Sequence, residues 1–552
     1  MRVAPRLRLG LGIESGSIFT LILVLALVGC GSSEDTDQAT NTTSEIAEVR
    51  TFRYSTSGDI LGLDPYTHNE GPNNAMKDNL YEGLVHRAYD LSLHPALATD
   101  WEQTDPLTWR FNLRKGVKFH NGNAFTADDV LTSLERIRMP NSSMTFAVAA
   151  IEKIVKIDDH TIDIITRYPD PTLLLNLPLF WIMDKEWLEE NDGMDIQEGA
   201  VVSTFANLNV NGTGPFILQE WVPDTRTVLV PNPDWWNTPR HNLNKAIFQP
   251  IANNSTRVAA LLSGDIDLMY PVPLQDIARL ESSPGVSVLQ GPELRVIFLG
   301  FDQHRDELLD MPGSGKNPFK DVRVRKAFYQ AIDIEAIHRV VMRKASKPTG
   351  LMIAEGNNGF QPDMNERFPY DSGAAKKLLA DAGYPNGFSV TFDCPNDRYV
   401  NDEAICLSII PMLKRIGIDV KLNAQTKSLH FEKISRTQGY NTSFYMLGWT
   451  PGSYDAHNPL VQLMSLDGEG QGTWNSGRYT HPRIEELTDL IGGEIDVDKR
   501  NSMIREAFRI HQQDVGHIPL HQQALAWGVG NRVEEVKQRP QNDVDLRYVI
   551  MK

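Results

Sequence analysis

The chain has 552 residues and a mass of 62.0 kDa, a length that excludes a single small module and predicts several domains or lobes. Its 41% hydrophobic and 23% charged residues are typical of a soluble globular protein and exclude overall disorder. The 54 Lys and Arg against 71 Asp and Glu give a formal charge of -17, which makes nucleic acid a poor partner. Only three cysteines occur, and no Cys/His spacing typical of a zinc site is present.

An export signal is predicted over residues 1–29. Three arginines precede the apolar run 18–29, which is as long as a signal-peptide core and shorter than the roughly 20 residues of a membrane span. The sequence Leu-Val-Gly-Cys that ends at Cys30 resembles a bacterial lipobox, so Cys30 is the predicted lipidation site; an ordinary secretory signal is the alternative. By analogy with lipoprotein sorting, Gly31 in place of Asp indicates an outer membrane. Residues 30–47, rich in Ser, Thr and acids, predict a disordered tether.

The first clear strand and helix lie between residues 109 and 137. Trp109, Phe111 and Leu113 alternate with polar residues, which predicts a half-buried strand. After a Gly-containing turn, Thr126 can cap a helix, and Asp129 stands in the capping-box position. A strand, a turn and a helix therefore follow one another.

The same alternation returns later in the chain. A helix is predicted over 372–382 and a strand over 388–392, followed by a helix near 402–416 and a strand over 418–422. Strands that alternate with helices favour an α/β architecture with at least two sheets. No internal repeat is evident, which argues against a solenoid or propeller.

Motifs for catalysis are absent from the sequence. No H-E-x-x-H, no G-x-S-x-G and no G-x-G-x-x-G after a strand occurs. The stretch 313–316 lacks the other residues of a phosphate loop and is predicted to be a surface loop. The scattered histidines are interpreted as solvated or hydrogen-bonded structural residues rather than metal ligands; they include His120, His457, His511, His517 and His521.

Several segments together resemble the extracellular solute-binding proteins of family 5, the peptide, dipeptide and nickel receptors of ABC importers. The most specific segments are LRKGVKFHNG from Leu113 and FTADDV from Phe125. The others are ALATDW from Ala96, GTGPF from Gly212, LVPNPDWW ending at Trp236, LLSGDIDL from Leu261, PFKDVRVRKAFYQAID from Pro318, LLADAGYPNGF from Leu378, Gly448-Trp449, and IPLHQQ from Ile518. They occur in family order, with the family core at about 93–470.

The resemblance implies an α/β fold, a two-lobed periplasmic-binding-protein clamshell (type II, cluster C-like) with an extra domain inserted in the first lobe. A ligand that bridges both lobes would favour the closed form. The implied divisions are lobe I at 48–90, 205–296 and 515–552, the inserted domain at 91–204, and lobe II at 297–514.

The implied function is that of the substrate-binding component of an ABC importer. Such a protein captures a peptide-like solute and delivers it to the transmembrane permease subunits. The chain would be a lipid-anchored monomer in the periplasmic space, without a cofactor and without enzymatic activity. The alternatives are a secreted lipoprotein hydrolase, for which no nucleophile, base or metal motif is recognisable, and a receptor for a metal complex or haem.

Arg398 is the predicted ligand anchor. It lies in the run 394–401 between a predicted strand and a predicted helix, at an end of a sheet where ligands of open α/β sheets bind. The residues Arg-Tyr-x-Asn, which include Tyr399, resemble the Arg-Pro-Tyr-Asn loop of dipeptide receptors, in which the arginine holds the ligand's carboxylate. A guanidinium suits this role because its fork binds both oxygens. An ion pair of Arg398 with Asp397 or Asp402 is the alternative.

The segment 448–458 departs from the family pattern. Peptide receptors that grip a free α-amino group have an Asp three residues after this tryptophan, where the present chain has Gly452. Asp455 is the nearest substitute, and its alternative role is a turn or helix cap. Since a buried ammonium needs a counter-charge, unmodified di- and tripeptides are not expected to be the best ligands. The predicted ligand-binding residues of this segment are Trp449, Thr450, Asp455, His457 and Asn458.

Cys394 and Cys406 are the only cysteines left in an exported body. A short-range disulfide is therefore predicted between them. Two buried free thiols are the alternative.

Overall fold

The computed structural model describes residues 49–197, 203–466, 468 and 471–552. The predicted signal peptide, Cys30 and the tether lie outside these residues. Within the described ranges, no helix is long and apolar enough to cross a membrane.

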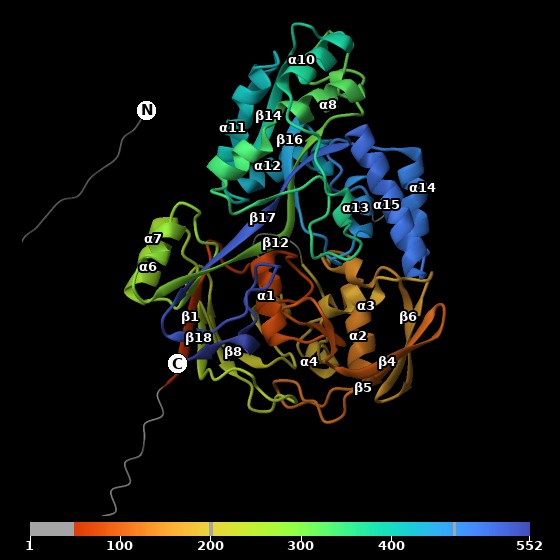
Figure 1. Cartoon of the computed structure of the whole chain (residues 1–552). Helices are drawn as coiled ribbons and strands as arrows, with labels where there is room; N and C mark the ends of the chain where they lie inside the picture. The colour runs from red at the N-terminus through yellow and green to blue at the C-terminus, as the bar shows by residue number, and fades with distance from the viewer. Residues whose placement is uncertain (1–48, 198–202, 467, 469–470) are drawn as a thin grey trace, which may run out of the picture. The chain divides into compact units, whose positions relative to one another are not determined.

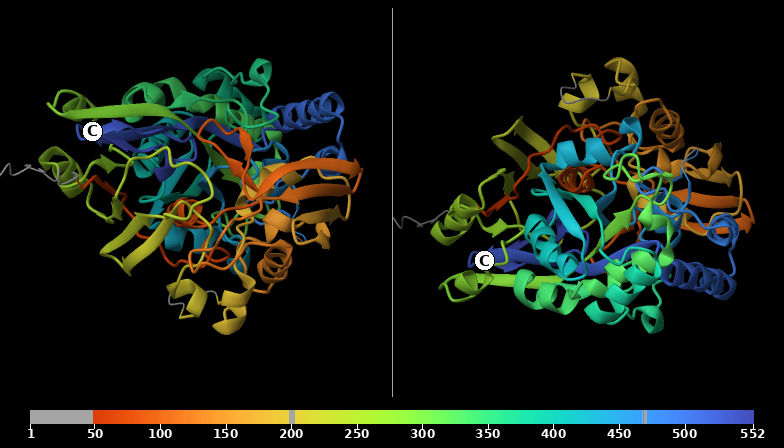
Figure 2. Two further views of the ribbon diagram at one scale, coloured as in Figure 1. Left: turned by 90° about the horizontal axis from the view of Figure 1, so that it is seen from below. Right: turned by 90° about the horizontal axis from the view of Figure 1, so that it is seen from above.

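One large mixed sheet organises the fold (Figure 1). Its strands lie in the order β15 (Asp419–Gln425), β14 (Ser389–Pro395), β16 (Phe444–Trp449), β12 (Val286–Phe301), β17 (His517–Gly530), β11 (Leu268–Met269), β1 (Thr51–Ser55), β10 (Lys245–Phe248), β9 (Arg226–Pro231) and β8 (Phe216–Val222), with β13 (Lys347–Pro348) paired to β17. The long strands β12 and β17 are antiparallel and run side by side in both views of Figure 2. They connect the part of the sheet around β1 with the part around β14, as in a two-lobed binding protein.

The part of the sheet around β14 is buried on both faces. On β12, Ile297 and Leu299 belong to one hydrophobic cluster, whereas Val296 and Phe298 belong to another, because successive side chains of a strand point to opposite faces. Helices α8 (Val322–Ala331), α9 (Ile334–Ala336), α10 (Ser372–Asp381) and α11 (Asp402–Lys414) contribute to the first cluster; α12 (Lys427–Ile434), α13 (His457–Leu463), α14 (Pro482–Gly493) and α15 (Val497–Asp514) contribute to the second.

A second sheet lies within the predicted inserted domain. It is antiparallel, in the order β4 (Ala98–Asp105), β5 (Thr108–Leu113), β7 (Thr161–Thr166) and β6 (Ile151–Asp158). Its buried residues Phe111 and Ile162 belong to the same hydrophobic cluster as Phe52 of β1 and Trp527 of β17. The inserted segment therefore shares one core with lobe I.

The remaining elements surround these sheets. Two short hairpins are formed by β2 (Val85–Arg87) with β3 (Leu93–Pro95) and by β18 (Val533–Glu535) with β19 (Ile550–Met551). The other α-helices are α1 (Gly71–Leu80), α2 (Ala127–Ile137), α3 (Leu173–Asn176), α4 (Lys185–Glu190), α5 (Phe205–Leu208), α6 (Asn254–Ser263) and α7 (Ile277–Glu281).

Local sequence signals predicted several of these elements correctly. The capping box of Thr126 and Asp129 is present at the start of α2. Strands β14 and β15 are parallel and α11 connects them, which confirms the predicted strand–helix–strand unit. Gly383 and Gly417 follow α10 and α11 with φ of 92° and 94°, a left-handed conformation in which a side chain would be strained.

Candidate ligand-binding site

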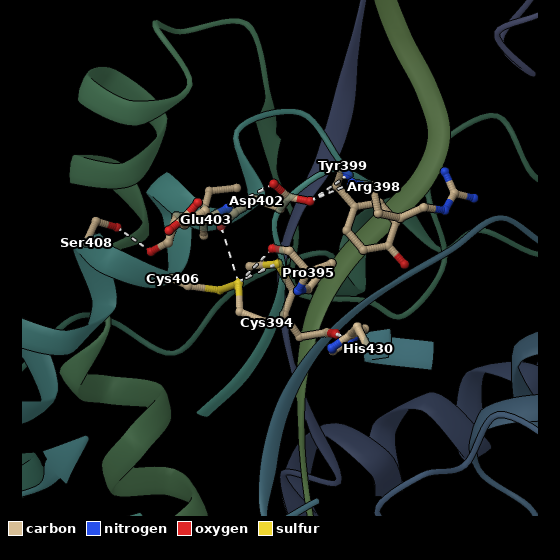
Figure 3. The surroundings of a disulfide bond; sticks show 11 residues. Cys394, Pro395, Arg398, Tyr399, Asp402, Glu403, Cys406, Ser408 and His430 are labelled. Carbon is tan, nitrogen blue, oxygen red and sulfur yellow. Dashed lines mark hydrogen bonds between the residues drawn. A yellow bond between two sulfur atoms is a disulfide. The ribbon is translucent and has the colours of Figure 1, made fainter. Parts of the chain in front are cut away.

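The loop that connects β14 to α11 (residues 396–401) carries the predicted anchor Arg398. Cys394 at the end of β14 and Cys406 in α11 are joined by a disulfide, which links the two elements that flank this loop (Figure 3). The disulfide thus holds the end of β14 against α11 and fixes both ends of the loop.

Asp402 binds the backbone of the loop rather than the guanidinium of Arg398. Its carboxylate accepts hydrogen bonds of 2.9 Å from the N–H groups of Arg398 and Tyr399 (Figure 3). Asp397 instead accepts a hydrogen bond of 2.6 Å from the N–H of Lys427. The alternative of an ion pair between Arg398 and one of these aspartates is therefore wrong.

The Arg398 guanidinium is free to meet a ligand. The residue is exposed, and its guanidinium makes no hydrogen bond to any residue that the structure describes. The guanidinium carbon lies 5.3 Å from the centre of the Tyr399 ring. Partial loss of hydration next to the surrounding protein atoms, followed by the nearby Arg295 cation, lowers the pKa of Arg398. An anionic ligand group would relieve this unfavourable environment.

Tyr399 connects the Arg398 loop to the end of β16. Its hydroxyl donates a hydrogen bond of 3.3 Å to the Gly448 carbonyl. A Cβ atom on Gly448 would lie only 2.7 Å from Tyr399 Cε1, so the ring packs directly on the glycine backbone. The Arg398 loop and the segment 448–458, both predicted to bind ligand, are therefore in contact.

The two crossing strands also contribute to the site, which the sequence analysis missed. Gln523 of β17 accepts a hydrogen bond of 3.1 Å from the Val400 N–H and donates one to the Glu293 carboxylate of β12. Arg295 Nε donates a hydrogen bond of 2.9 Å to the same carboxylate. An arginine between Leu294 and Val296, directly before the apolar run 296–299, is the sequence signal that could have indicated this position.

Trp449 ends β16, Thr450 follows it, and Asn458 lies in the first turn of α13. Trp449 Nε1 donates a hydrogen bond of 2.8 Å to Asn458 Oδ1, so the amide orients the indole. The Thr450 hydroxyl is inaccessible to water and has no hydrogen-bond partner within the described part of the chain.

Asp455 and His457 are bonded to other residues of the protein. Asp455 is fully buried and forms an ion pair with Arg500 at 2.7 Å, so the prediction that it presents a free carboxylate to a ligand is wrong. It also accepts a 2.8 Å hydrogen bond from the His457 N–H, which is the turn-cap alternative. His457 Nε2 lies 2.9 Å from the Thr488 carbonyl of α14, and burial lowers the pKa of this histidine.

Tyr454 brings the same loop against lobe I. The Arg87 guanidinium carbon of β2 lies 4.5 Å from the centre of the Tyr454 ring. The phenol is close to Arg87, Asp543 and Asp78, and burial raises its pKa to about 12. Its φ of 53° is unusual for a residue with a side chain, and such strain is often found at ligand sites.

The predicted structural role of the other histidines is confirmed for three of them. His120 Nε2 lies 3.2 Å from the Gly214 carbonyl, and the buried rings of His511 and His517 are joined by a 3.0 Å hydrogen bond. His521 is also buried, but neither ring nitrogen has a hydrogen-bond partner among the described residues.

Comparison with known proteins identifies relatives over almost the whole chain. Heme-binding protein A of Haemophilus influenzae is 28% identical over 545 residues, covering 94% of this chain and 95% of that protein. The Dipeptide-binding protein of Escherichia coli is 27% identical over 515 residues, covering 88% and 90%.

Solved structures confirm the fold. The dipeptide binding protein from Pseudoalteromonas sp. SM9913 in complex with Met-Leu superposes with a TM-score of 0.76 at 21% identity, covering 91% of this chain and all of that chain. The binding protein AgaA from A. tumefaciens in complex with agropinic acid superposes with a TM-score of 0.75 at 24% identity. The match covers 91% of this chain and 99% of that chain.

The family assignment rests on a match to residues 92–471. The model that matches describes the bacterial extracellular solute-binding proteins, family 5 Middle. This range is close to the family core expected from the sequence segments. The chain therefore belongs to the bacterial extracellular solute-binding proteins of family 5.

Proposed function

We propose that this protein is the substrate-binding component of an ABC importer and that it captures an anionic, peptide-like solute for delivery to the permease. The observation that carries the proposal is the Arg398 guanidinium, which has no protein acceptor among the described residues. A guanidinium binds both oxygens of a carboxylate and is therefore well suited to hold one end of such a solute. Relatives named for a dipeptide and for heme support a small organic ligand.

Beside Arg398, the proposed ligand would contact Tyr399, Trp449, Thr450 and Asn458. Tyr399 packs beside Arg398, and the unpartnered Thr450 hydroxyl can exchange a hydrogen bond with a polar ligand atom after a small movement. Asp455 is left out because Arg500 already neutralises it. The proposed ligand end is thus anionic, with aromatic and polar neighbours.

The proposed location is the periplasmic side of a bacterial membrane. Export by residues 1–29 and lipidation at Cys30 are predictions from the sequence. Lobe I (48–90, 205–296 and 515–552) and lobe II (297–514) would then close on the solute, with the chain acting as a monomer. Changing Cys30 to Ala is expected to leave the precursor unprocessed or to release the protein, whereas retention at the membrane with the normal mature size would contradict lipidation.

The binding function is tested by incubating the purified chain with a peptide library and analysing the bound fraction by mass spectrometry. An intact bound peptide supports the proposal, and cleaved products would support the hydrolase instead. A haem titration followed by absorbance tests the remaining alternative.

The anchor is then tested by calorimetry with Arg398→Ala. Removal of a charge-assisted hydrogen bond is expected to weaken binding by about 1.5 to 3 kcal/mol. Arg226→Ala is the control, because this arginine pairs with Glu220 at the surface of β8 and β9. Unchanged affinity in the Arg398 variant would contradict the anchor.

A further inference from the structure

Two guanidinium groups, not one, lie against the Tyr399 ring. The guanidinium carbons of Arg398 and Arg295 lie 5.3 Å and 5.8 Å from the ring centre. Arg398 comes from the loop after β14, whereas Arg295 comes from the crossing strand β12. The fold therefore brings a second cation to the anchor.

Of the two cations, only Arg295 is bonded directly to a carboxylate. Arg295 uses Nε to bind Glu293, and its two terminal nitrogens make no hydrogen bond to the residues described. The second oxygen of Glu293 is occupied by Gln523. Glu70 is the other acid that acts on Arg398, and it makes no hydrogen bond to this guanidinium. The pair thus keeps several free N–H donors.

The two guanidinium groups at the Tyr399 ring repel each other, and like charges repel most strongly where water is excluded. The Arg295 side chain is only 17% exposed and that of Glu293 only 3%, so water screens the repulsion between the two guanidiniums poorly. A ligand with one carboxylate would satisfy Arg398 and leave the terminal nitrogens of Arg295 without an anionic partner.

A cationic ligand group would not find a free carboxylate at Asp455. Asp455, the acid of the segment 448–458, is fully buried and paired with Arg500. The residues around Arg398 therefore favour anionic over cationic ligand groups.

We propose that the natural solute carries two carboxylates close together at the end held by Arg398, and that Arg295 is the specificity-determining residue for the second one. A peptide that ends in Asp or Glu has this chemistry. The inference rests on the proposed function, since it assumes that Arg398 holds the first carboxylate. Each terminal nitrogen of Arg295 can donate to a carboxylate while Nε keeps its bond to Glu293.

The test uses two ligands that differ by one carboxylate, N-acetyl-alanyl-aspartate and N-acetyl-alanyl-asparagine. Calorimetry on the wild-type protein is expected to give at least about tenfold tighter binding of the aspartate peptide. Arg295→Gln is expected to reduce this preference to about threefold or less, chiefly by weakening the binding of the aspartate peptide. Arg398→Gln is expected to weaken both peptides, and the surface control Arg226→Gln neither.

A second variant guards against misfolding. Arg295→Gln alone leaves Glu293 buried without its cation, so the double variant Glu293→Gln/Arg295→Gln restores the charge balance, and unfolding temperatures are measured for both. The double variant is also expected to lose the preference for aspartate.

The outcomes separate this inference from the proposed function. Equal binding of the two peptides by the wild-type protein, or a preference that survives in both Arg295 variants, would overturn the role of Arg295 and leave the Arg398 anchor standing. If Arg398→Gln changes neither affinity, or if the folded wild-type protein binds neither peptide, the proposed anchor and this inference both fail.

Discussion

Arg500 binds the carboxylate of Asp455 through both of its terminal nitrogens. The distances are 2.7 Å from Nη2 to Oδ1 and 3.0 Å from Nη1 to Oδ2, and Asn358 Nδ2 donates a further hydrogen bond of 2.6 Å to Oδ2. Arg500 lies on α15, so the pair fixes the loop that carries Asp455 to this helix. Loop position, rather than ligand contact, is the role that this geometry gives to Asp455.

Breaking this buried pair is expected to destabilise the protein. Asp455→Asn leaves the Arg500 charge without a counter-charge, and the loss of one partner of a buried pair typically costs about 3 to 5 kcal/mol of unfolding free energy. The double variant Asp455→Leu/Arg500→Leu should be closer to wild type because no charge is left unpaired. Urea unfolding followed by tryptophan fluorescence measures both. Normal stability of Asp455→Asn together with lost ligand affinity would instead identify Asp455 as a ligand anchor.

Gly448→Ala is expected to disturb the contact between the two ligand loops. The new methyl group would lie 2.7 Å from Tyr399 Cε1 and from Ile297 Cδ1, so Tyr399 has to move. Overpacking of this kind typically costs about 1 to 3 kcal/mol of stability. Gly58→Ala is the matched control because its methyl group meets no atom within 4 Å. Wild-type affinity and stability in the Gly448 variant would show that the ring does not need this contact.

A blocked amino terminus is expected to be tolerated by the ligand site. Gly452 stands at the position where the family resemblance would place an amine-binding aspartate, so the free and N-acetylated forms of one peptide should bind the wild-type protein with affinities within about threefold. Gly452→Asp should create a preference for the free amine, and Gly452→Asn, of equal size without charge, should not. A tenfold or larger wild-type preference for the free amine, measured by calorimetry, would contradict the expectation.

Removal of the disulfide is expected to loosen the Arg398 loop. Cys394 and Cys406 are 12 residues apart, and in the chain-entropy model a bond closing so short a loop stabilises by roughly 3 kcal/mol. Cys394→Ser/Cys406→Ser should therefore unfold at a lower urea concentration. Mass spectrometry without reductant checks the bond itself. Alkylation of both thiols in the unreduced, unfolded protein would exclude it.

The protein is expected to lose stability as the pH falls below about 6.5. Burial lowers the pKa of several histidines in the folded state, so between pH 6.5 and about 4 the unfolded state binds more protons than the folded state. The histidines whose pKa falls to about 3 or 4 are His120, His241, His430, His511 and His521. Burial also lowers the pKa of His86, His457 and His517. Among the described residues, seven acids whose pKa burial raises act in the opposite direction and offset part of this loss: Asp129 and Asp543, with values of about 6, and Asp59, Glu82, Asp170, Asp267 and Asp402.

One histidine can be tested by itself. His430 is fully buried and its Nε2 lies 3.0 Å from the Met446 carbonyl. His430→Gln should reduce the pH dependence of the unfolding free energy by up to about 1.4 kcal/mol per pH unit between pH 6.5 and 4. Urea unfolding at several pH values gives this slope. An unchanged slope would show that His430 does not titrate differently in the two states.

Local sequence patterns were sufficient for the elements that carry the site. The capping box of α2, the glycines after α10 and α11, and the alternation of strands and helices are short-range features, because capping, turn geometry and side-chain period act over a few residues. The place of Arg398 in a loop between strand and helix followed from the same signals, and the order of the family segments indicated the two-lobed fold.

Long-range packing decided which of the predicted residues are free. The sequence could not tell that Arg500, 45 residues from Asp455, would neutralise it, or that Arg295 would lie against the ring of Tyr399. Both depend on how α15 and β12 pack on the loops, and an ion pair across such a distance has no local sequence signal. Charge at the site is therefore determined by tertiary contacts, since burial and pairing, rather than residue type, fix which charges remain available for a ligand.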